Sequence, residues 1–203
     1  MQIIRHSCQE YPASIAEQET LVAEILADET VPSLIFTEHP ALFSIGTSGS
    51  EDDVLQRKVD GEDIAIYPSG RGGEVTYHGP GQLLCYVLAD LRHNQDLHQH
   101  VFRLEEMIIR TLADLGVQAG RDERGIGVWV DGKKIAAIGV RCRKWITLHG
   151  IALNINPNLK HFSGIVACGM SDSPVTSLHQ LGVDVDRQQI EALIAKHSAL
   201  FDS

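Results

Sequence analysis

The sequence lacks any apolar run near the roughly 18 residues that a membrane-spanning helix needs. The opening residues, Met1 to His6, also lack the succession of basic, apolar and small residues that marks a secretory signal peptide. Of the 203 residues, 43% are hydrophobic, which is enough for one sizeable core and short for two. We therefore expect one domain over residues 1–203, located in the cytoplasm and without a membrane partner.

Cysteine is scarce as well, and its placement excludes two common uses. The four cysteines form no C-x-x-C pair, and two of them lie within apparent strands. Reduced thiols fit this scatter better than a disulfide framework or a zinc cage. The Gly-x-Ser-x-Gly, His-Glu-x-x-His and Gly-Lys-Ser/Thr motifs are absent too. The sequence offers no support for a hydrolase, a zinc protease or a P-loop enzyme, and we expect no metal.

Positive charge is in deficit, since 17 Lys and Arg residues face 27 Asp and Glu residues, for a net charge of −10. A chain of this sign is not expected to use nucleic acid as its main partner.

Hydrophobic periodicity predicts an α/β (α+β) fold with a mixed, mostly antiparallel sheet flanked by helices. Helices are expected over residues 12–28 and 97–115 and after Asp186, where Gln189 completes a capping box. A short helix is expected within 175–181, closed by Gly182. The Asp131-Gly132 pair predicts a hairpin turn. We expect a mobile loop at 46–60, irregular structure at 156–175, and strands at residues 2–6, 33–37, 42–45, 64–67, 83–89, 127–130, 133–140 and 145–155.

The stretch from Tyr67 to Gln82 reads YPSGRGGEVTYHGPGQ and contains five glycines and two prolines. On composition alone, its glycines and prolines are the turns of a β-hairpin. They also permit close approach of the backbone to a ligand. Arg71 and His78 stand at the two ends of the central run, where a plain turn has no need of them, and this favours a ligand cradle.

Two further residues stand out by their surroundings. Cys168 lies in the loop Gly164-Ile165-Val166-Ala167-Cys168-Gly169-Met170 and not in a strand. A buried, inert thiol is the more common use of such a residue, and a nucleophile is the alternative. Lys134 lies within an apolar strand, where partial desolvation strengthens its effect on neighbours, whereas Lys133 is nearer the turn. Alternation alone does not choose between these two lysines.

His78 and His149 each precede a glycine in or beside a strand, so either can point into a pocket. Taken alone, each is more often a hydrogen-bonded core histidine.

Four blocks together closely resemble the lipoyl(octanoyl) transferase family over residues 30–182. They are RGGEVTYHGPGQ at 71–82, KIAAIGVR at 134–141, HGIALN at 149–154, and ACG at 167–169 with the later VTSL at 175–178. The resemblance implies the fold of lipoate and biotin protein ligases. It also implies transfer of an octanoyl group from octanoyl-acyl carrier protein to a lysine of lipoyl domains, in 2-oxoacid dehydrogenases and the glycine-cleavage H protein.

In this family the cysteine that matches Cys168 carries the acyl group as a thioester, and the lysine that matches Lys134 sustains the thiolate. The resemblance implies no cofactor. It further implies an acyl tunnel lined by Arg71, Gly72, Gly73, Glu74, Val75, Thr76, Tyr77, His78, Ala137, Ile138, Gly139, His149, Gly150, Ile151 and Ala152.

We expect a monomer that docks its acidic carrier protein through one basic patch, made of Arg121, Arg124, Lys133, Lys134, Arg141, Arg143 and Lys144. An ATP-dependent lipoate or biotin protein ligase is the alternative within the same fold. A non-catalytic module that binds a carrier protein is an alternative from a different class.

Overall fold

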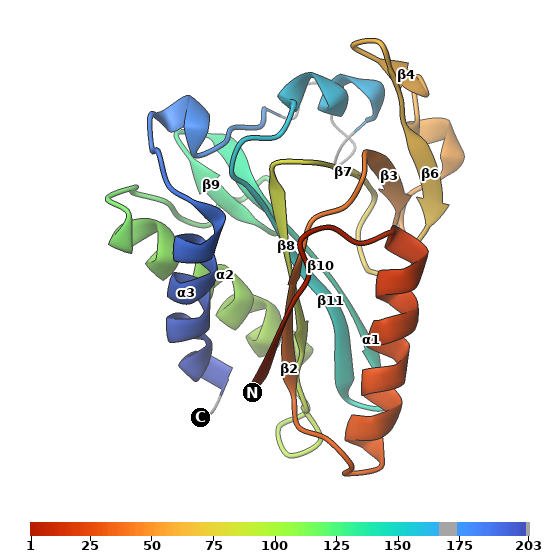
Figure 1. Cartoon of the computed structure of the whole chain (residues 1–203), viewed down its shortest axis with the longest axis vertical. Coiled ribbons are helices and arrows are strands. Elements are labelled where there is room, and N and C mark those ends of the chain that lie inside the picture. Colours follow the sequence, from red (N-terminus) through yellow and green to blue (C-terminus); the bar gives the residue numbers. More distant parts are fainter. Residues whose placement is uncertain (167–173, 202–203) are drawn as a thin grey trace.

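The computed structural model describes residues 1–166 and 174–201. Its centre is a six-stranded sheet in the order β1-β2-β8-β11-β10-β9 (Figure 1). The strands are β1 (Gln2–Arg5), β2 (Ser33–Thr37), β8 (Gln82–Leu88), β11 (Ile146–Asn154), β10 (Lys133–Arg143) and β9 (Val128–Val130). Within this sheet, the β1–β2 pair alone is parallel among the described strands. The predicted mixed, mostly antiparallel sheet is therefore confirmed.

Helices cover both faces of this sheet (Figure 1). The first, α1 (Tyr11–Leu26), packs Val22 and Ile25 against one face, where Ile35, Tyr86 and Leu88 point. The second and third, α2 (Leu97–Asp114) and α3 (Arg187–His197), cover the other face, where Leu34 and Phe36 point. Because successive residues of a strand point to opposite faces, β2 and β8 are apolar on both sides.

A second, three-stranded sheet has the order β6-β3-β7. It comprises β6 (Ala65–Pro68), β3 (Leu42–Ile45) and β7 (Val75–His78). It encloses its own apolar cluster around Phe43, Val75 and Tyr77. Since β7 belongs to this sheet and β8 to the large one, the turn His78-Gly79-Pro80-Gly81 passes from one sheet to the other. The hairpin interpretation of this stretch is therefore wrong.

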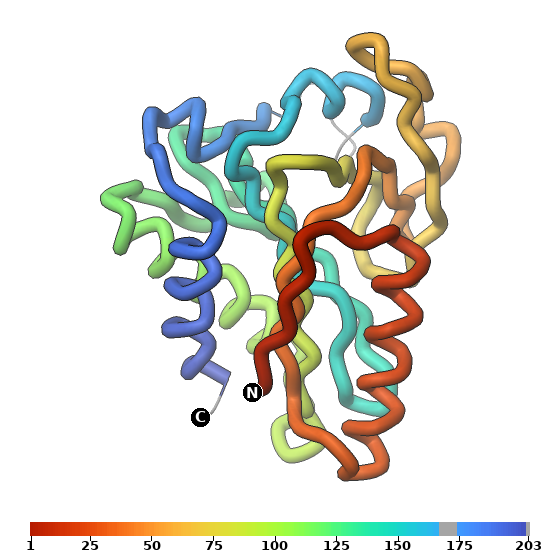
Figure 2. The backbone as a smooth tube through the Cα atoms, in the orientation of Figure 1, coloured from red at the N-terminus to blue at the C-terminus, as the bar shows by residue number. Residues whose placement is uncertain are grey.

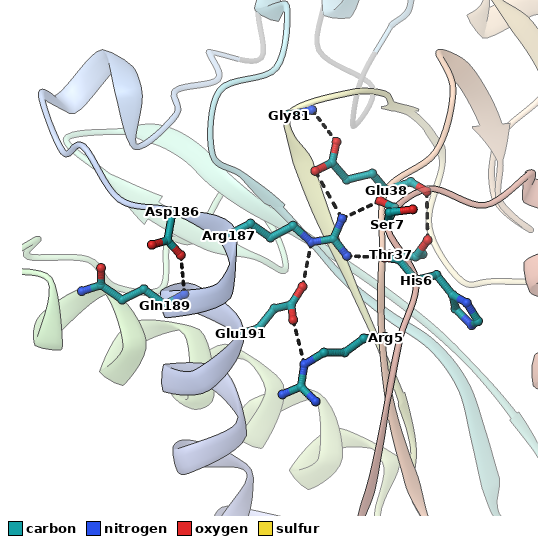
Figure 3. A network of polar contacts seen from close by, with 10 residues as sticks. All are labelled: Arg5, His6, Ser7, Thr37, Glu38, Gly81, Asp186, Arg187, Gln189 and Glu191. Carbon is teal, nitrogen blue, oxygen red and sulfur yellow. Dashed lines mark hydrogen bonds and ion pairs between the residues drawn. The ribbon is translucent and has the colours of Figure 1, made fainter.

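The turn between the sheets is tied to the N-terminus and to α3 by one polar network. In Figure 3, the guanidinium of Arg187 lies between Glu38, Glu191 and the backbone carbonyls of His6 and Ser7. Glu38 accepts a hydrogen bond from the backbone N–H of Gly81 at 2.9 Å. This network joins α3 to β1 and to the turn, and Figure 2 shows β1 running beside β2 although about thirty residues separate them.

Two stretches differ from the sequence-based expectation. Residues 46–60 form a short 3-10 helix (Glu51–Asp53) with a Ser50 capping box, followed by β4 (Lys58–Val59), which pairs with β5 (Glu62–Asp63). The helix expected within 175–181 is only a 3-10 turn (His179–Leu181), although Gly182 closes it in the left-handed region as expected. Further 3-10 turns occupy Leu159–Gly164 and Ser198–Phe201.

Candidate functional site

A pocket of about 660 Å³ lies where the two sheets meet. Its volume is within the roughly 300–1,000 Å³ that small-molecule sites occupy. Strands β7, β8, β10 and β11, the Arg71–Glu74 segment and the starts of α1 and α2 all contribute to its wall. Its described lining is Tyr11, Ser48, Arg71–Thr76, His78, Gln82, Leu84, Tyr86, Leu97, His98, Val101, Arg124–Ile126, Lys134, Ala137–Val140, His149–Ala152, Asn154, Phe162 and Val175.

The predicted tunnel residues converge on this pocket from three separate segments, with one exception. Tyr77 is not among the lining residues that the structure describes. Its side chain is 1% exposed, and its hydroxyl lies 2.9 Å from Nδ1 of His161 in the core of the small sheet. Alternation along β7 explains this, because Thr76 and His78 point to the face opposite Tyr77.

Glycine allows the Arg71–Glu74 segment to lie directly against β10. Gly72 donates its backbone N–H to the carbonyl of Val140 at 2.8 Å. A Cβ atom on Gly139 would lie 3.0 Å from both Gly72 O and Arg71 Cδ, closer than side chains normally pack. The close approach therefore forms a continuous wall of the pocket from two segments distant in sequence.

The buried side chain of Arg71 holds this wall together through hydrogen bonds. Its guanidinium donates to the backbone carbonyls of Ser44, Glu74 and Gly72 at 2.6, 2.8 and 3.0 Å. It also donates to Oγ of Ser44. The side chain is only 8% exposed, so these bonds compensate for the loss of water around the charge.

Two histidines of the pocket lining, His78 and His149, are neutral at pH 7. Burial, assisted by nearby His39 and Arg71, lowers the pKa of His78 to about 3. Burial, together with Arg71 and Arg141, lowers the pKa of His149 to about 4. His149 has a φ of 62°, outside the range of a regular strand, and its ring centroid lies 6.3 Å from that of Tyr86.

Tyr86 is a pocket residue that sequence reasoning missed. The Nδ1 of His39 faces the carbonyl of Gln9 at 2.6 Å and must donate to it, so Nε2 accepts the Tyr86 hydroxyl proton, also at 2.6 Å. Burial raises the pKa of Tyr86 well above its ordinary value. A tyrosine in an otherwise apolar strand was the one available signal in the sequence.

Lys134 lies at the pocket wall, whereas Lys133 is exposed. The Lys134 side chain is 9% exposed, and its Nζ lies 4.9 Å from the centre of the Trp129 ring. A register shift in the β9–β10 pairing falls between Lys134 and Ala136. The structure thus separates two lysines that alternation could not distinguish.

A separate segment, residues 174–176, pairs with the backbone of Lys134, and we call this segment the strap. The backbone N–H of Lys134 donates to Pro174 O at 2.9 Å, and Thr176 N–H donates to Lys134 O at 3.0 Å. The strap therefore pairs in parallel with β10 at Lys134. The predicted nucleophile Cys168 lies outside the described residues, six positions before the strap in sequence.

The expected basic patch is divided into two groups. Arg141 and Arg143 form ion pairs with Glu19 of α1, while Arg124 lies at the pocket and pairs with Asp122. Strand β10 runs from Lys133 to Arg143, and at about 3.3 Å per residue its ends are too far apart for a single patch. The prediction of one continuous surface is therefore wrong.

Within residues 1–166 and 174–201, no group of three or more His, Cys, Asp or Glu side chains can hold a metal ion. In the same ranges, no helix is both long and apolar enough to cross a membrane. Cys8, Cys85 and Cys142 are free thiols.

Known proteins with similar sequences share one description. The family model of the lipoyl protein ligase A/B catalytic domain matches residues 10–199. A curated protein named octanoyltransferase, from Paramagnetospirillum magneticum, is 47% identical over 206 residues, which cover 98% of this chain and 95% of that protein.

Solved structures share the fold at much lower identity. A bipartite lipoate protein ligase from Thermoplasma acidophilum has a TM-score of 0.68 at 20% identity, over 98% of this chain and 83% of that chain. A biotin protein ligase from Aquifex aeolicus, in complex with biotin and ATP, has a TM-score of 0.60 at 15% identity, over 99% of this chain and 70% of that one. The predicted lipoate/biotin protein ligase-like fold is confirmed.

Proposed function

The chain belongs to the lipoyl protein ligase A/B catalytic domain family, and on this premise we propose that it is an octanoyltransferase of protein lipoylation. It is an acyltransferase, as its curated relatives are. The proposed donor is octanoyl-acyl carrier protein. The proposed acceptors are lysines on lipoyl domains of 2-oxoacid dehydrogenases and on the glycine-cleavage H protein.

The observation that carries this proposal is the pocket itself. Its volume of about 660 Å³ suits a short acyl chain. Ala137, Gly139, Gly150 and Ala152 line it with small side chains or none, which leaves this space open. Lys134 supplies one cationic group at the wall of this otherwise mainly apolar space. The apolar space accommodates a fatty tail, and the cation of Lys134 serves the acyl-transfer centre at the carboxyl end of that tail.

In the proposed first step, the thiolate of Cys168 attacks the thioester carbon of the donor. A new C–S bond forms to Cys168, the C–S bond to the carrier breaks, and the carrier leaves as a thiolate that takes its proton from the Lys134 ammonium, which leaves Lys134 neutral. The free energies of the two thioesters are nearly equal, so the exchange needs no ATP. The ammonium of Lys134 stabilises the attacking thiolate, because an adjacent cation lowers a thiol pKa.

In the second step, the neutral ε-amine of the acceptor lysine attacks the thioester of Cys168. The tetrahedral intermediate collapses with formation of an amide bond and release of the Cys168 sulfur as a thiolate. The attacking nitrogen loses one proton, and Lys134 in its neutral form is the proposed acceptor. Backbone N–H groups near the pocket stabilise the oxyanion.

The decisive experiment is to incubate the protein with octanoyl-acyl carrier protein in the absence of ATP and to measure its intact mass. We expect an octanoyl adduct that hydroxylamine removes and that the substitution Cys168→Ser abolishes. Cys8→Ser is the matched control, because Cys8 is an exposed thiol outside the pocket lining, and it should retain the adduct.

The same experiment separates the alternatives. An ATP-dependent lipoate or biotin ligase forms no covalent adduct with the carrier thioester, and it modifies the acceptor lysine only when ATP and the free acid are supplied. A non-catalytic binding module binds the carrier but does not change in mass under either condition. Either result contradicts octanoyl transfer through Cys168.

A further inference from the structure

Five buried side chains form one unbroken hydrogen-bond chain along the wall of the pocket. Arg71 donates to Oγ of Ser44 at 2.9 Å, which lies 3.1 Å from Nε2 of His78. Nδ1 of His78 lies 2.8 Å from Oε1 of Gln82, whose Nε2 lies 2.9 Å from Oδ1 of Asn154. Nδ2 of Asn154 ends the chain 3.0 Å from the backbone carbonyl of Thr176.

The chemistry of its two ends determines the direction of every bond. The carbonyl of Thr176 can only accept, so Asn154 must turn its NH₂ toward it and its Oδ1 toward Gln82. Gln82 then donates its own NH₂ to Asn154 and presents Oε1 to His78. The proton of neutral His78 therefore resides on Nδ1, and Nε2 accepts the hydroxyl proton of Ser44.

Burial makes the chain intolerant of a change in any one of these directions. Gln82, Asn154 and Thr176 are 1%, 4% and 2% exposed. A reversed amide would bring two acceptors together where water cannot intervene, at a cost of about 1–3 kcal/mol for each unsatisfied group. His78 accordingly serves as a connector in this chain, since both of its nitrogens are occupied.

The chain ends on the strap, residues 174–176, which borders Lys134. Thr176 offers its carbonyl to Asn154 and its N–H to Lys134 O. Two residues after the strap, the N–H of Leu178 donates to Asn154 O at 3.0 Å, which gives this part of the chain a second contact with β11. Asn154 thus holds the segment that pairs with the backbone of Lys134.

We propose that Gln82 and Asn154 are positioning residues, which hold the strap against Lys134 and thereby set the geometry of acyl transfer. This inference rests on the proposed function, because the strap follows Cys168 in sequence and Lys134 is the proposed cationic partner of that thiol. The two amides act through the backbone of Thr176 and Lys134. A misplacement of about 1 Å between reacting groups can reduce a rate by about a hundredfold.

A matched pair of substitutions on β11 tests this role. Asn154→Leu and Thr147→Val each replace a buried polar side chain by an apolar one of nearly the same shape. Each removes one donated and one accepted bond, because Thr147 donates to Val87 O and accepts from Ala89 N–H. Thr147 lies outside the described lining of the pocket, so its variant measures only the cost of lost buried bonds.

The first readout is hydrogen exchange of the Lys134 and Thr176 amides without substrate. In Asn154→Leu we expect both amides to exchange about tenfold faster or more, because local opening of the strap becomes easier. Exchange at these amides in Thr147→Val should match the unsubstituted protein. Unchanged exchange in Asn154→Leu would overturn the proposal, whether or not the protein transfers octanoyl groups.

The second readout is the single-turnover rate of octanoyl transfer. Asn154→Leu should lower this rate at saturating donor about tenfold or more, while the donor KM changes less than about threefold. Equal rates in the two variants, with exchange altered only in Asn154→Leu, would show that the strap contact does not govern transfer and would overturn the positioning role. Failure of the unsubstituted protein to form an adduct would instead reject the proposed function.

Gln82→Glu gives an independent, pH-dependent test. An ionised carboxylate at this position accepts from both neighbours, so Asn154 must reverse and present Oδ1 to the carbonyl of Thr176. A protonated carboxyl restores the donor. We expect Thr176 exchange, relative to the unsubstituted protein at the same pH, to approach normal as pH falls through the buried carboxyl's raised pKa. A ratio independent of pH would contradict the assigned direction of the chain.

Discussion

At the scale of single residues, neighbouring lysines show how burial creates a distinct chemical role. Lys133 and Lys134 differ by one position in β10, yet only Lys134 lies at the pocket beside the ring of Trp129. Its ammonium is largely removed from water, where its field on a nearby thiol is stronger than at the surface. The proposed partnership between Lys134 and Cys168 therefore predicts very different consequences for the two lysines.

Replacement of Lys134 by Ala should raise the pKa of the Cys168 thiol toward the ordinary value of about 8.5. The measurement is the rate of iodoacetamide labelling against pH, followed by peptide mass analysis of the segment that contains Cys168. Lys133→Ala is the control and should leave the profile unchanged. The exposed Cys8 thiol serves as an internal standard in both variants. An identical profile in Lys134→Ala would refute the electrostatic role.

At the scale of elements, the turn from β7 to β8 determines how the two sheets meet. Gly81 has a φ of 82°, and its carbonyl accepts from the backbone N–H groups of Ile155 and Asn156. A Cβ atom there would lie 2.3 Å from Asn156 O. This turn therefore needs glycine for two reasons, the left-handed backbone and the close approach of another segment.

Gly81→Ala and Gly61→Ala together separate these two reasons. Gly61 has nearly the same φ of 85°, but nothing lies within 4 Å of a Cβ atom built there. We expect Gly61→Ala to lower the free energy of unfolding by roughly 1 kcal/mol, the cost of the left-handed backbone. Gly81→Ala should cost about 1–3 kcal/mol more, because the crowded site must shift.

Urea unfolding of both variants measures this difference. Equal losses of stability would show that the turn between the sheets tolerates a methyl group. They would then contradict the tight packing of Gly81 on Asn156.

At the scale of the whole molecule, four histidines from separate parts of the chain are buried in their neutral form. Burial lowers the pKa of His39, and lowers the pKa values of His78, His100 and His149 to about 3, 4 and 4. In the unfolded chain each titrates near 6.5. The unfolded state therefore binds more protons than the folded state between about pH 6.5 and pH 4.

Folding should accordingly be most stable above pH 6.5 and weaken as the pH falls toward 4. His78, His100 and His149 each contribute a loss of about 1.4 kcal/mol per pH unit within that window, and His39 adds a loss in the same direction. Urea unfolding at pH 7, 6 and 5 checks the slope, and a free energy of unfolding that is constant over this range would contradict it.

His100→Leu isolates one histidine from the others. Neither ring nitrogen of His100 has a hydrogen-bond partner within the described part of the chain, so an apolar replacement of similar size leaves no bond broken. The free energy of unfolding of this variant should change less steeply with pH, because unfolding of the variant takes up one proton fewer. A slope equal to that of the unsubstituted protein would assign the acid sensitivity to the other histidines.

Much of the fold was predictable because it depends on local patterns. Strand β2 was expected at residues 33–37, where it lies, and the second helix differs from its prediction by one residue. The Asp131-Gly132 turn has the two positive φ values expected for a type I′ hairpin. Apolar residues recur every second position in a strand and every third or fourth position in a helix. These spacings show in the sequence alone which face of each element is buried.

The convergence of the pocket residues was predictable only through family resemblance, since periodicity alone leaves Arg71, Lys134 and His149 as unrelated polar residues. Tyr77 was assigned to the pocket because its motif was treated as one block, whereas strand alternation turns it into the core of the small sheet. The basic patch failed because sequence proximity along an extended strand is not proximity in space.

The sequence by itself determined most of the helices and strands and the class of sheet, because each depends on residues within a few positions of one another. The tertiary structure decided that β7 and β8 belong to different sheets, that Lys134 and not Lys133 faces the pocket, and that Gln82 and Asn154 join His78 to the strap. These features depend on pairings between segments tens of residues apart, whose geometry exists only once both sheets have packed.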